Sequence, residues 1–222
     1  MNLGFRQIGN FTSQSAERGI NMNRKVFGIS LPRTGTSSLA VAFRHLDFHT
    51  AHYLTEADYE YIHEYDFAND FPIPLRYKEL DERFPNSKFI FTARPSESWL
   101  DSYELHLSRT KHISDGNWQD YNLSLFGTLD FDRKHFKNVY MKHWEDVLEY
   151  FKGRADDLLI LDFPYRLKSW NDICDFVEVK LPDDVLEFPN KCGSYSISNP
   201  FCPDNEDRRT DEQWKRFRRR KP

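Results

Sequence analysis

Residues 32–38 combine side chains and backbone features that bind phosphate groups. The segment contains one guanidinium, one glycine and four hydroxyls, in the order Pro32, Arg33, Thr34, Gly35, Thr36, Ser37 and Ser38. Glycine lets a ligand come close to the backbone, and the first N–H groups of a helix attract anions. We therefore predict an anion-binding loop at the start of a helix. The alternative is a Ser or Thr residue that caps an ordinary helix.

The loop differs from the phosphate-binding loop of ATPases. That loop requires the pattern Gly-x4-Gly-Lys-Ser/Thr. Here Gly28 and Gly35 are seven residues apart, and Thr36 stands where the lysine would be. The sequence therefore argues against conventional hydrolysis of a nucleoside triphosphate.

A second pair of chemically capable residues, Arg94 and Ser102, lies further along the chain. Ser102 follows Arg94 by eight residues, about two helical turns, so its hydroxyl can face back toward the guanidinium. A guanidinium and a hydroxyl that converge in this way suit a phosphate monoester. Taken singly, Arg94 could equally be an ion-paired residue and Ser102 a surface residue of a helix.

The elements that must position these residues alternate between strands and helices. We predict three pairs of a strand followed by a helix: 25–30 with 37–46, 88–93 with 97–107, and 158–162 with 170–177. Further helices are predicted from Thr55, with Asp58 completing a capping box, over 75–84 and over 131–152, whereas 108–130 reads as irregular. This alternation predicts an α/β fold with a mostly parallel sheet. Ligands of such sheets bind at the carboxyl ends of the strands, where both segments lie.

Length, charge and cysteine content narrow the class of protein. The 222 residues predict a single domain over 24–205, preceded by a loose leader over 1–23 and followed by a basic tail over 206–222. The net charge of -4 argues against a general nucleic-acid binder. No apolar run approaches the ~20 residues of a membrane span, and residues 1–19 do not resemble a secretory signal. Three scattered cysteines favour a cytoplasmic location over a disulfide scaffold or a zinc site.

Taken together, the two segments resemble the sulfotransferase family, whose donor is 3'-phosphoadenosine 5'-phosphosulfate (PAPS). The resemblance rests on residues 32–37 and on the interval from Arg94 to Ser102, and a weaker similarity runs from about Lys25 to Phe188. It implies a P-loop NTPase-like fold, a three-layer sandwich around a mostly parallel central sheet. It also implies that residues 32–38 bind the 5'-phosphosulfate, and that Arg94 and Ser102 bind the 3'-phosphate. No metal is expected.

The chain departs from the family pattern at three places. Many relatives have Lys where this chain has Arg33, and an arginine cannot readily give a proton to the leaving group. Cytosolic relatives usually have a Trp at the place of Ser38, where it packs on the adenine. The Arg-Lys-Gly segment that closes over the donor in those relatives is absent, and Lys191-Cys192-Gly193 is at best a partial substitute.

Sulfuryl transfer to a hydroxyl or amine also needs a group that takes the proton of the acceptor. Asp70 is the favoured catalytic residue, because it precedes a proline-stiffened break and because the resembling branch has an Asp in an Asp-x-Pro setting here. The alternative is that Asp70 caps the helix near Leu75. The other candidates between the two loops are His45, His49, His52, His63, Glu64 and Asp66. His106 is expected to be a partly exposed surface residue.

The predicted function is that of a PAPS-dependent sulfotransferase acting on a small-molecule or carbohydrate acceptor. Residues 47–74 and 108–130 are expected to shape the acceptor pocket, although their many aromatic residues could equally belong to the core. Two alternatives stay open on the same fold. One is a nucleotide or nucleoside kinase, which would need a loop lysine and a magnesium carboxylate, and the other is a protein that binds partners without catalysis.

Overall fold

The computed structural model of the chain describes residues 24–110, 116–162, 168–181 and 183. The predicted leader 1–23, the tail 206–222 and the segment Lys191–Gly193 lie outside these residues. Short apolar runs form five parallel strands in the order β2-β3-β1-β4-β5. The strands are β1 (Val26–Gly28), β2 (Thr50–His52), β3 (Phe67–Asn69), β4 (Lys88–Ala93) and β5 (Leu158–Asp162). The predicted α/β fold with a parallel sheet is confirmed.

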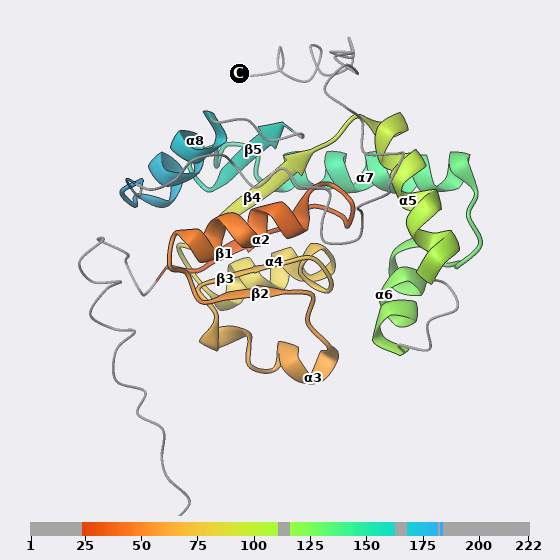
Figure 1. Cartoon of the computed structure of the whole chain (residues 1–222), viewed down its shortest axis with the longest axis horizontal. Coiled ribbons are helices and arrows are strands. Elements are labelled where there is room, and N and C mark those ends of the chain that lie inside the picture. The colour runs from red at the N-terminus through yellow and green to blue at the C-terminus, as the bar shows by residue number, and fades with distance from the viewer. Residues whose placement is uncertain (1–23, 111–115, 163–167, 182, 184–222) are drawn as a thin grey trace, which may run out of the picture.

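Helices cover both faces of this sheet and continue beyond one of its ends (Figure 1). In chain order the helical elements are α2 (Thr36–His45), α3 (Glu56–Tyr59), the 3-10 turn η1 (Ile62–Glu64), α4 (Ile73–Arg83), α5 (Ser96–Thr110), α6 (Gly116–Phe126), α7 (Arg133–Tyr150) and α8 (Lys168–Val177). None of the described helices has both the length and the apolar composition that a bilayer-crossing segment requires.

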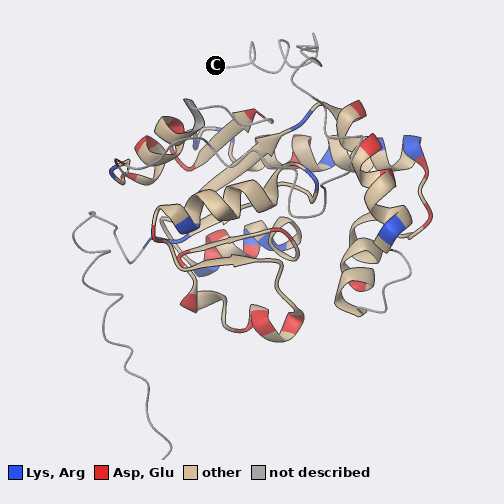
Figure 2. Cartoon of the chain, viewed as in Figure 1, with Lys and Arg blue, Asp and Glu red and all other residues tan. Residues whose placement is uncertain are grey.

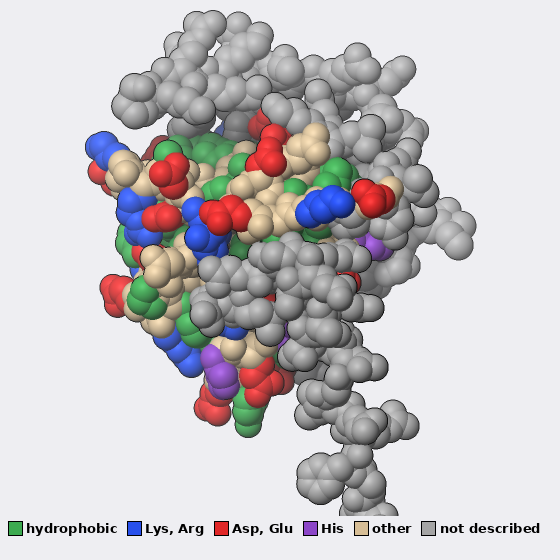
Figure 3. All heavy atoms as spheres, turned by 90° about the vertical axis from the view of Figure 1, so that its left-hand side faces the viewer, with side chains coloured by type: hydrophobic (Ala, Val, Ile, Leu, Met, Phe, Trp, Pro, Cys, Tyr) green, Lys and Arg blue, Asp and Glu red, His purple; other side chains and the backbone are tan. Residues whose placement is uncertain are grey.

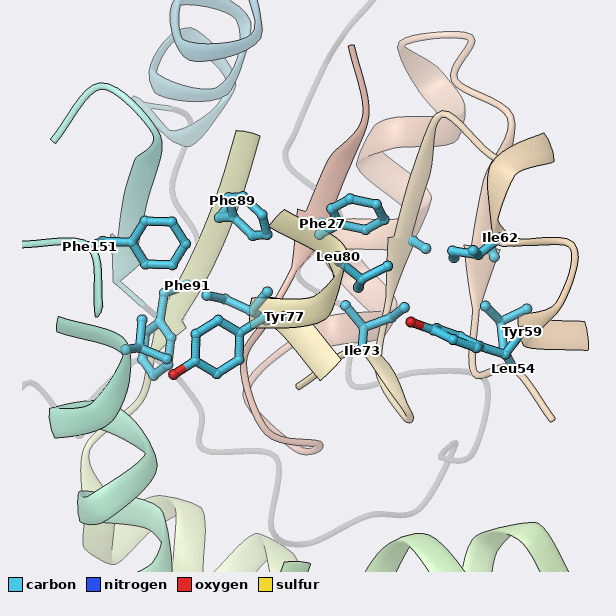
Figure 4. Packing of buried hydrophobic residues seen from close by; sticks show 14 of the residues in the cluster. Phe27, Leu54, Tyr59, Ile62, Ile73, Tyr77, Leu80, Phe89, Phe91 and Phe151 are labelled. Carbon is cyan, nitrogen blue, oxygen red and sulfur yellow. The ribbon is translucent and has the colours of Figure 1, made fainter. Parts of the chain in front are cut away.

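Neighbouring residues of a strand point to opposite faces of the sheet, and this alternation builds two separate apolar layers. Val26 and Ile90 pack with α2 and α8 on one face. Phe27 and Phe89 pack on the other face with α4 and α7, where Figure 4 shows the rings beside Tyr77 of α4. The molecule is therefore a sandwich of helices, sheet and helices.

A third apolar cluster lies past the carboxyl end of the sheet. It joins α5, α6 and α7 through stacked rings, including Trp99 against Tyr140 and Phe126 against Phe136. Leu31, in the loop that follows β1, is completely buried in this cluster. The cluster thereby fixes α5 beside the loop.

Charged residues lie mostly on the helices and connections rather than on the strands (Figure 2). The end of the sheet that faces the viewer in Figure 3 is the amino end of the strands, where acidic and basic side chains are interspersed. The loop after β1 and the start of α5 lie at the opposite, carboxyl end (Figure 1).

Two strands, β2 and β3, were not predicted from the sequence. Each has only three residues, too few to show a period of two. They form because they pair with each other, and β3 also pairs with β1. The expectation of an irregular segment over 108–130 was wrong as well, because α6 forms there and buries Trp118 and Tyr121.

Helix boundaries agreed with the sequence except around the proline-rich break. The capping box of Thr55 and Asp58 is present, but α3 is a single turn. α4 begins at Ile73 rather than at Leu75, with Pro74 in its first turn, where the missing N–H of proline costs nothing.

Candidate functional site

The loop between β1 and α2 follows the strand at which the order of the sheet changes direction. β1 pairs with β3 on one side and with β4 on the other. The connections therefore leave its carboxyl end in opposite directions, and ligands of such sheets usually bind at this point. Arg33 and Gly35 both have positive φ angles, of 70° and 94°. Gly35 precedes the first turn of α2 and supplies no side-chain cap. The alternative of an ordinary Ser or Thr cap is therefore wrong.

Three hydroxyls of this loop are buried and one is exposed. The Thr34 hydroxyl donates to the Leu31 carbonyl (2.8 Å) and accepts a hydrogen bond from Thr92 Oγ1 (2.7 Å). Thr36 and Ser38 are also buried, whereas Ser37 is exposed. Thr34 therefore shapes the loop, and Ser37 is the hydroxyl best placed to meet a ligand.

Arg94 emerges from the end of β4 and is fixed by its neighbours. Its side chain donates to Ser98 Oγ (Nε, 3.0 Å) and to the Arg33 carbonyl (Nη1, 2.5 Å). The Tyr140 hydroxyl bonds both backbone atoms of Arg94, the N–H at 3.2 Å and the carbonyl at 2.7 Å. Burial, followed by the charge of Arg33, lowers the pKa of the Arg94 guanidinium to about 10. An anion at this point would relieve both effects.

Helix α5 connects the two predicted segments directly. Ser102 Oγ accepts a hydrogen bond from Arg33 Nε (3.2 Å), and Trp99 Nε1 donates to the Pro32 carbonyl (2.9 Å). The loop, Arg94 and Ser102 thus lie together, but Ser102 contacts Arg33, and the hydroxyl that Arg94 Nε contacts is that of Ser98. Sequence reasoning missed Ser98, which contacts Arg94 from the first turn of α5. Its signal was the four-residue interval after Arg94.

Asp70 lies immediately after β3 with a positive φ of 66°. Its Oδ2 accepts a hydrogen bond from Thr36 Oγ1 (2.6 Å), and its Oδ1 accepts one from the Phe71 N–H (2.8 Å). Pro72 is the residue at the start of α4, without a side-chain cap. The alternative that Asp70 caps this helix is therefore wrong, and its carboxylate faces the loop.

The remaining candidate bases separate into two groups. His49 and Asp66 precede β2 and β3, and the His49 N–H donates to Asp66 Oδ2 (2.9 Å). They therefore lie at the amino ends of the strands, as do His63 and Glu64, whereas His45 ends α2 and contacts the ring of Trp170. His52, the last residue of β2, lies beside the loop instead, with Nε2 3.1 Å from Ser37 Oγ and 3.9 Å from Asp70 Oδ2.

His106 lies one turn beyond Ser102 on α5. It is half-buried, and its ring lies near those of Tyr103 and Trp118. Burial, followed by the charge of Arg33, lowers the pKa of His106 to about 4. The expected partial exposure of His106 is therefore confirmed, and its lowered pKa keeps the ring neutral near pH 7.

Several aromatic residues of the predicted acceptor segments belong to the core, among them Phe48, Tyr59, Phe67 and Phe126. Tyr121 contacts the rings of Tyr53 and Phe71, next to Asp70. In the ranges that the structure covers, no three His, Cys, Asp or Glu side chains gather into a metal-binding group.

We compared the chain with known proteins. A family profile described as a sulfotransferase domain matches residues 25–61 and 55–194. A curated protein of Aspergillus versicolor, named Ava biosynthesis cluster protein M, is 29% identical over 77% of this chain and 81% of its own length. A crystal structure of the mouse sulfotransferase SULT7A1 complexed with PAP aligns with a TM-score of 0.45 and 18% identity, over 72% of this chain and 61% of the mouse chain. This chain thus spans about three fifths of the mouse protein. Because the family profile covers more than half of the residues, the chain belongs to the sulfotransferase domain family.

Proposed function

We propose that this protein transfers a sulfuryl group from PAPS to a hydroxyl or amine of a small-molecule or carbohydrate acceptor. The observation that supports this most strongly is the meeting of Arg33, Arg94 and Ser102 at the carboxyl end of the sheet. Two guanidinium groups close together suit a ligand with two separate phosphates. The cytoplasmic location and the absence of a metal from the reaction stay predictions.

The donor would lie with its 5'-phosphosulfate in the loop over 32–38 and its 3'-phosphate at Arg94, Ser98 and Ser102. The first N–H groups of α2 and the exposed Ser37 hydroxyl would bind the 5'-phosphosulfate. Arg94 is positioned through its backbone by Tyr140, so little conformational freedom is lost when it binds.

The chemical step moves the sulfuryl group in line from a phosphate oxygen to the acceptor. Negative charge grows on the oxygen that leaves, and Arg33 with the loop N–H groups would stabilise that charge. Arg33 acts through charge and hydrogen bonds alone, since its guanidinium stays protonated. Asp70 is the predicted catalytic carboxylate, within hydrogen-bond distance of Thr36 in the same loop.

A nucleotide panel in a thermal-shift assay tests this function. We expect adenosine 3',5'-bisphosphate, the product of the donor, to raise the melting temperature more than adenosine 5'-monophosphate does, because only the bisphosphate carries the 3'-phosphate. Stabilisation by ATP with magnesium alone would indicate a kinase. No stabilisation by any of these nucleotides would contradict the proposal and favour the non-catalytic alternative.

A further inference from the structure

Asn69 is a completely buried polar residue at the carboxyl end of β3. In the sheet it lies between Gly28 of β1 and His52 of β2, its partners in register. A side-chain carbon on Gly28 would come within 2.6 Å of Asn69 Cβ, so the glycine makes room for this asparagine. The close approach places the Asn69 amide between His52 and residues 32–38, the loop proposed to bind the sulfuryl donor and called the donor loop below.

The contacts of this amide determine which of its atoms faces His52. Asn69 Nδ2 donates to the Thr36 carbonyl at 2.7 Å. A carbonyl can only accept, so the NH₂ group must point toward the loop. Oδ1 then faces His52 Nδ1 at 2.9 Å. Because Oδ1 can only accept, Nδ1 of the neutral imidazole must carry the hydrogen.

The other ring nitrogen, Nε2, is then left with its lone pair. It lies 3.1 Å from the Ser37 hydroxyl, which donates to it in this structure, and 3.9 Å from Asp70 Oδ2. When the Ser37 hydroxyl donates to the phosphosulfate instead, the lone pair of Nε2 becomes available to the acceptor. Ser37 belongs to the donor loop. Nε2 is thus an acceptor directed at the edge of the loop, beside a carboxylate that would stabilise a proton placed there.

We propose that His52 Nε2 takes the proton of the acceptor during sulfuryl transfer, with Asn69 as the positioning residue that fixes its tautomer. This inference rests on the proposed function and deepens it. The acceptor O–H or N–H proton moves to Nε2, and its electron pair forms the bond to sulfur. The S–O bond to the 5'-phosphate breaks, and its electron pair stays on the phosphate. The imidazolium afterwards releases the proton to solvent.

Charges from three elements act around this proton. Asp70, after β3, favours the imidazolium and so shares in catalysis through its charge. Arg33, in the loop after β1, and His106, on α5, each interact electrostatically with Asp70. An imidazole that already carries both protons cannot accept another, so we expect kcat to fall toward acidic pH.

Nitrogen-15 NMR of the imidazole rings of the full chain tests the tautomer without any activity. His52 signals are assigned by their loss in His52→Gln. At a pH where His52 is neutral, we expect Nδ1 to be protonated and Nε2 to be unprotonated. The opposite tautomer would overturn the inference, even if the protein proves to be a sulfotransferase.

Kinetics of His52→Gln test the role in catalysis, with His49→Gln as the matched control at the other end of β2. We expect kcat of His52→Gln to fall by about 10²-fold or more, with the affinity for adenosine 3',5'-bisphosphate retained. A loss below tenfold would overturn the inference. A wild-type protein that binds no bisphosphate would instead contradict the proposed function.

Asn69→Asp tests the positioning role of Asn69 through the pH profile, because the variant also loses the hydrogen bond to the Thr36 carbonyl and a lower kcat alone would not separate the two roles. A carboxylate at this place still accepts from Nδ1–H but favours the imidazolium, so the acid limb of the kcat profile should move to higher pH. An unmoved acid limb would overturn the role of Asn69. If the variant does not fold, Gly28→Ala, which displaces Asn69, takes its place and should lower kcat and disturb the tautomer; an unchanged tautomer and kcat would overturn the same role.

Discussion

Arg94 and Arg154 lie at opposite ends of the same sheet and are in opposite electrostatic situations. Arg154, four residues before β5, donates two hydrogen bonds to the Asp81 carboxylate (2.6 and 2.9 Å) and one to Asp157 (2.9 Å). These carboxylates raise the pKa of Arg154, Asp81 foremost. Arg94, after β4, is buried beside the cationic Arg33, and its pKa is lowered.

The difference supports the proposed role of Arg94 in binding an anion, whereas Arg154 is a structural cation. At the amino end of the sheet the protein supplies the anions itself, and the charges are balanced within the fold. At the carboxyl end, burial and then the charge of Arg33 lower the pKa of Arg94, and the charge of Asp70 only partly offsets the lowering of the Arg33 pKa by burial. Two neighbouring guanidinium groups of this kind are consistent with the proposed binding of a phosphorylated ligand.

Among the substitutions considered, Arg33→Ala should impair the proposed site at the carboxyl end of the sheet most strongly. We expect kcat to fall by about 10²–10³-fold, because the growing charge on the leaving oxygen loses its main stabilising group. Affinity for adenosine 3',5'-bisphosphate should fall far less. Steady-state kinetics with PAPS and an acceptor that supports turnover measure this effect, and an unchanged kcat would refute the role of Arg33.

Arg94→Gln should affect binding rather than chemistry. We expect the Kd of adenosine 3',5'-bisphosphate to rise by about 10–100-fold, roughly the loss of one charge-assisted contact. The affinity for adenosine 5'-monophosphate should change little. Calorimetry with both nucleotides measures the difference, and Arg154→Gln is the matched control. Equal losses of bisphosphate affinity in Arg94→Gln and Arg154→Gln would contradict the proposal that only Arg94 binds the nucleotide.

The pH dependence of unfolding tests whether His143, which lies near the loop after β1, is neutral in the folded protein. His143 of α7 is buried, with Nε2 2.8 Å from the carbonyl of Ile29, just before the loop. Burial lowers its pKa from 6.5 to about 4. Between these values the unfolded chain binds a proton that the folded chain does not, so stability is complete above about pH 6.5 and falls toward pH 4.

Urea unfolding of the wild type and His143→Gln measures this effect. We expect the variant to lose about 3 kcal/mol of the pH dependence between pH 7 and 4. His106 contributes with the same sign in both proteins and cancels in the difference. Identical pH profiles would show that His143 is not buried in its neutral form.

Asp81→Asn should have the smallest effect and should be confined to stability. We expect a loss of about 1 kcal/mol at pH 7, because the ion pair with Arg154 is partly exposed. The pKa of Asp81 is lowered, mainly by the hydrogen bonds from Arg154. Its contribution is therefore present above the ordinary pKa of a carboxyl and fades only as the pH falls below it, after His143 has begun to titrate. A loss of bisphosphate affinity in Asp81→Asn would contradict the separation of the two ends.

The elements that could be predicted from the sequence are those with a strong local pattern of apolar residues. The runs over β4 and β5 and the apolar stripe of α7 predicted their elements within a few residues. β2 and β3 could not be found, because three residues such as Phe67–Asn69 become a strand only through their neighbours in the sheet. For the same reason Asn69 and Gly28 gave no hint of their close approach.

The proximity of the two segments that form the proposed site could be predicted, because each segment depends on residues that are close together in the sequence. The loop over 32–38 and the interval from Arg94 to Ser102 depend on one strand-to-helix turn each, and the structure brings them together. The choice among the possible bases was harder, since it depends on which end of a strand each residue occupies. His49 and His52 are three residues apart, yet β2 places them at opposite ends of the sheet.

A crystal structure of the protein with adenosine 3',5'-bisphosphate tests the central claim most directly. The account predicts the 5'-phosphate against the backbone of residues 33–38, and the 3'-phosphate within hydrogen-bond distance of Arg94 and of Ser98 or Ser102. A nucleotide bound elsewhere on the molecule, or with no phosphate touching Arg94, would contradict it.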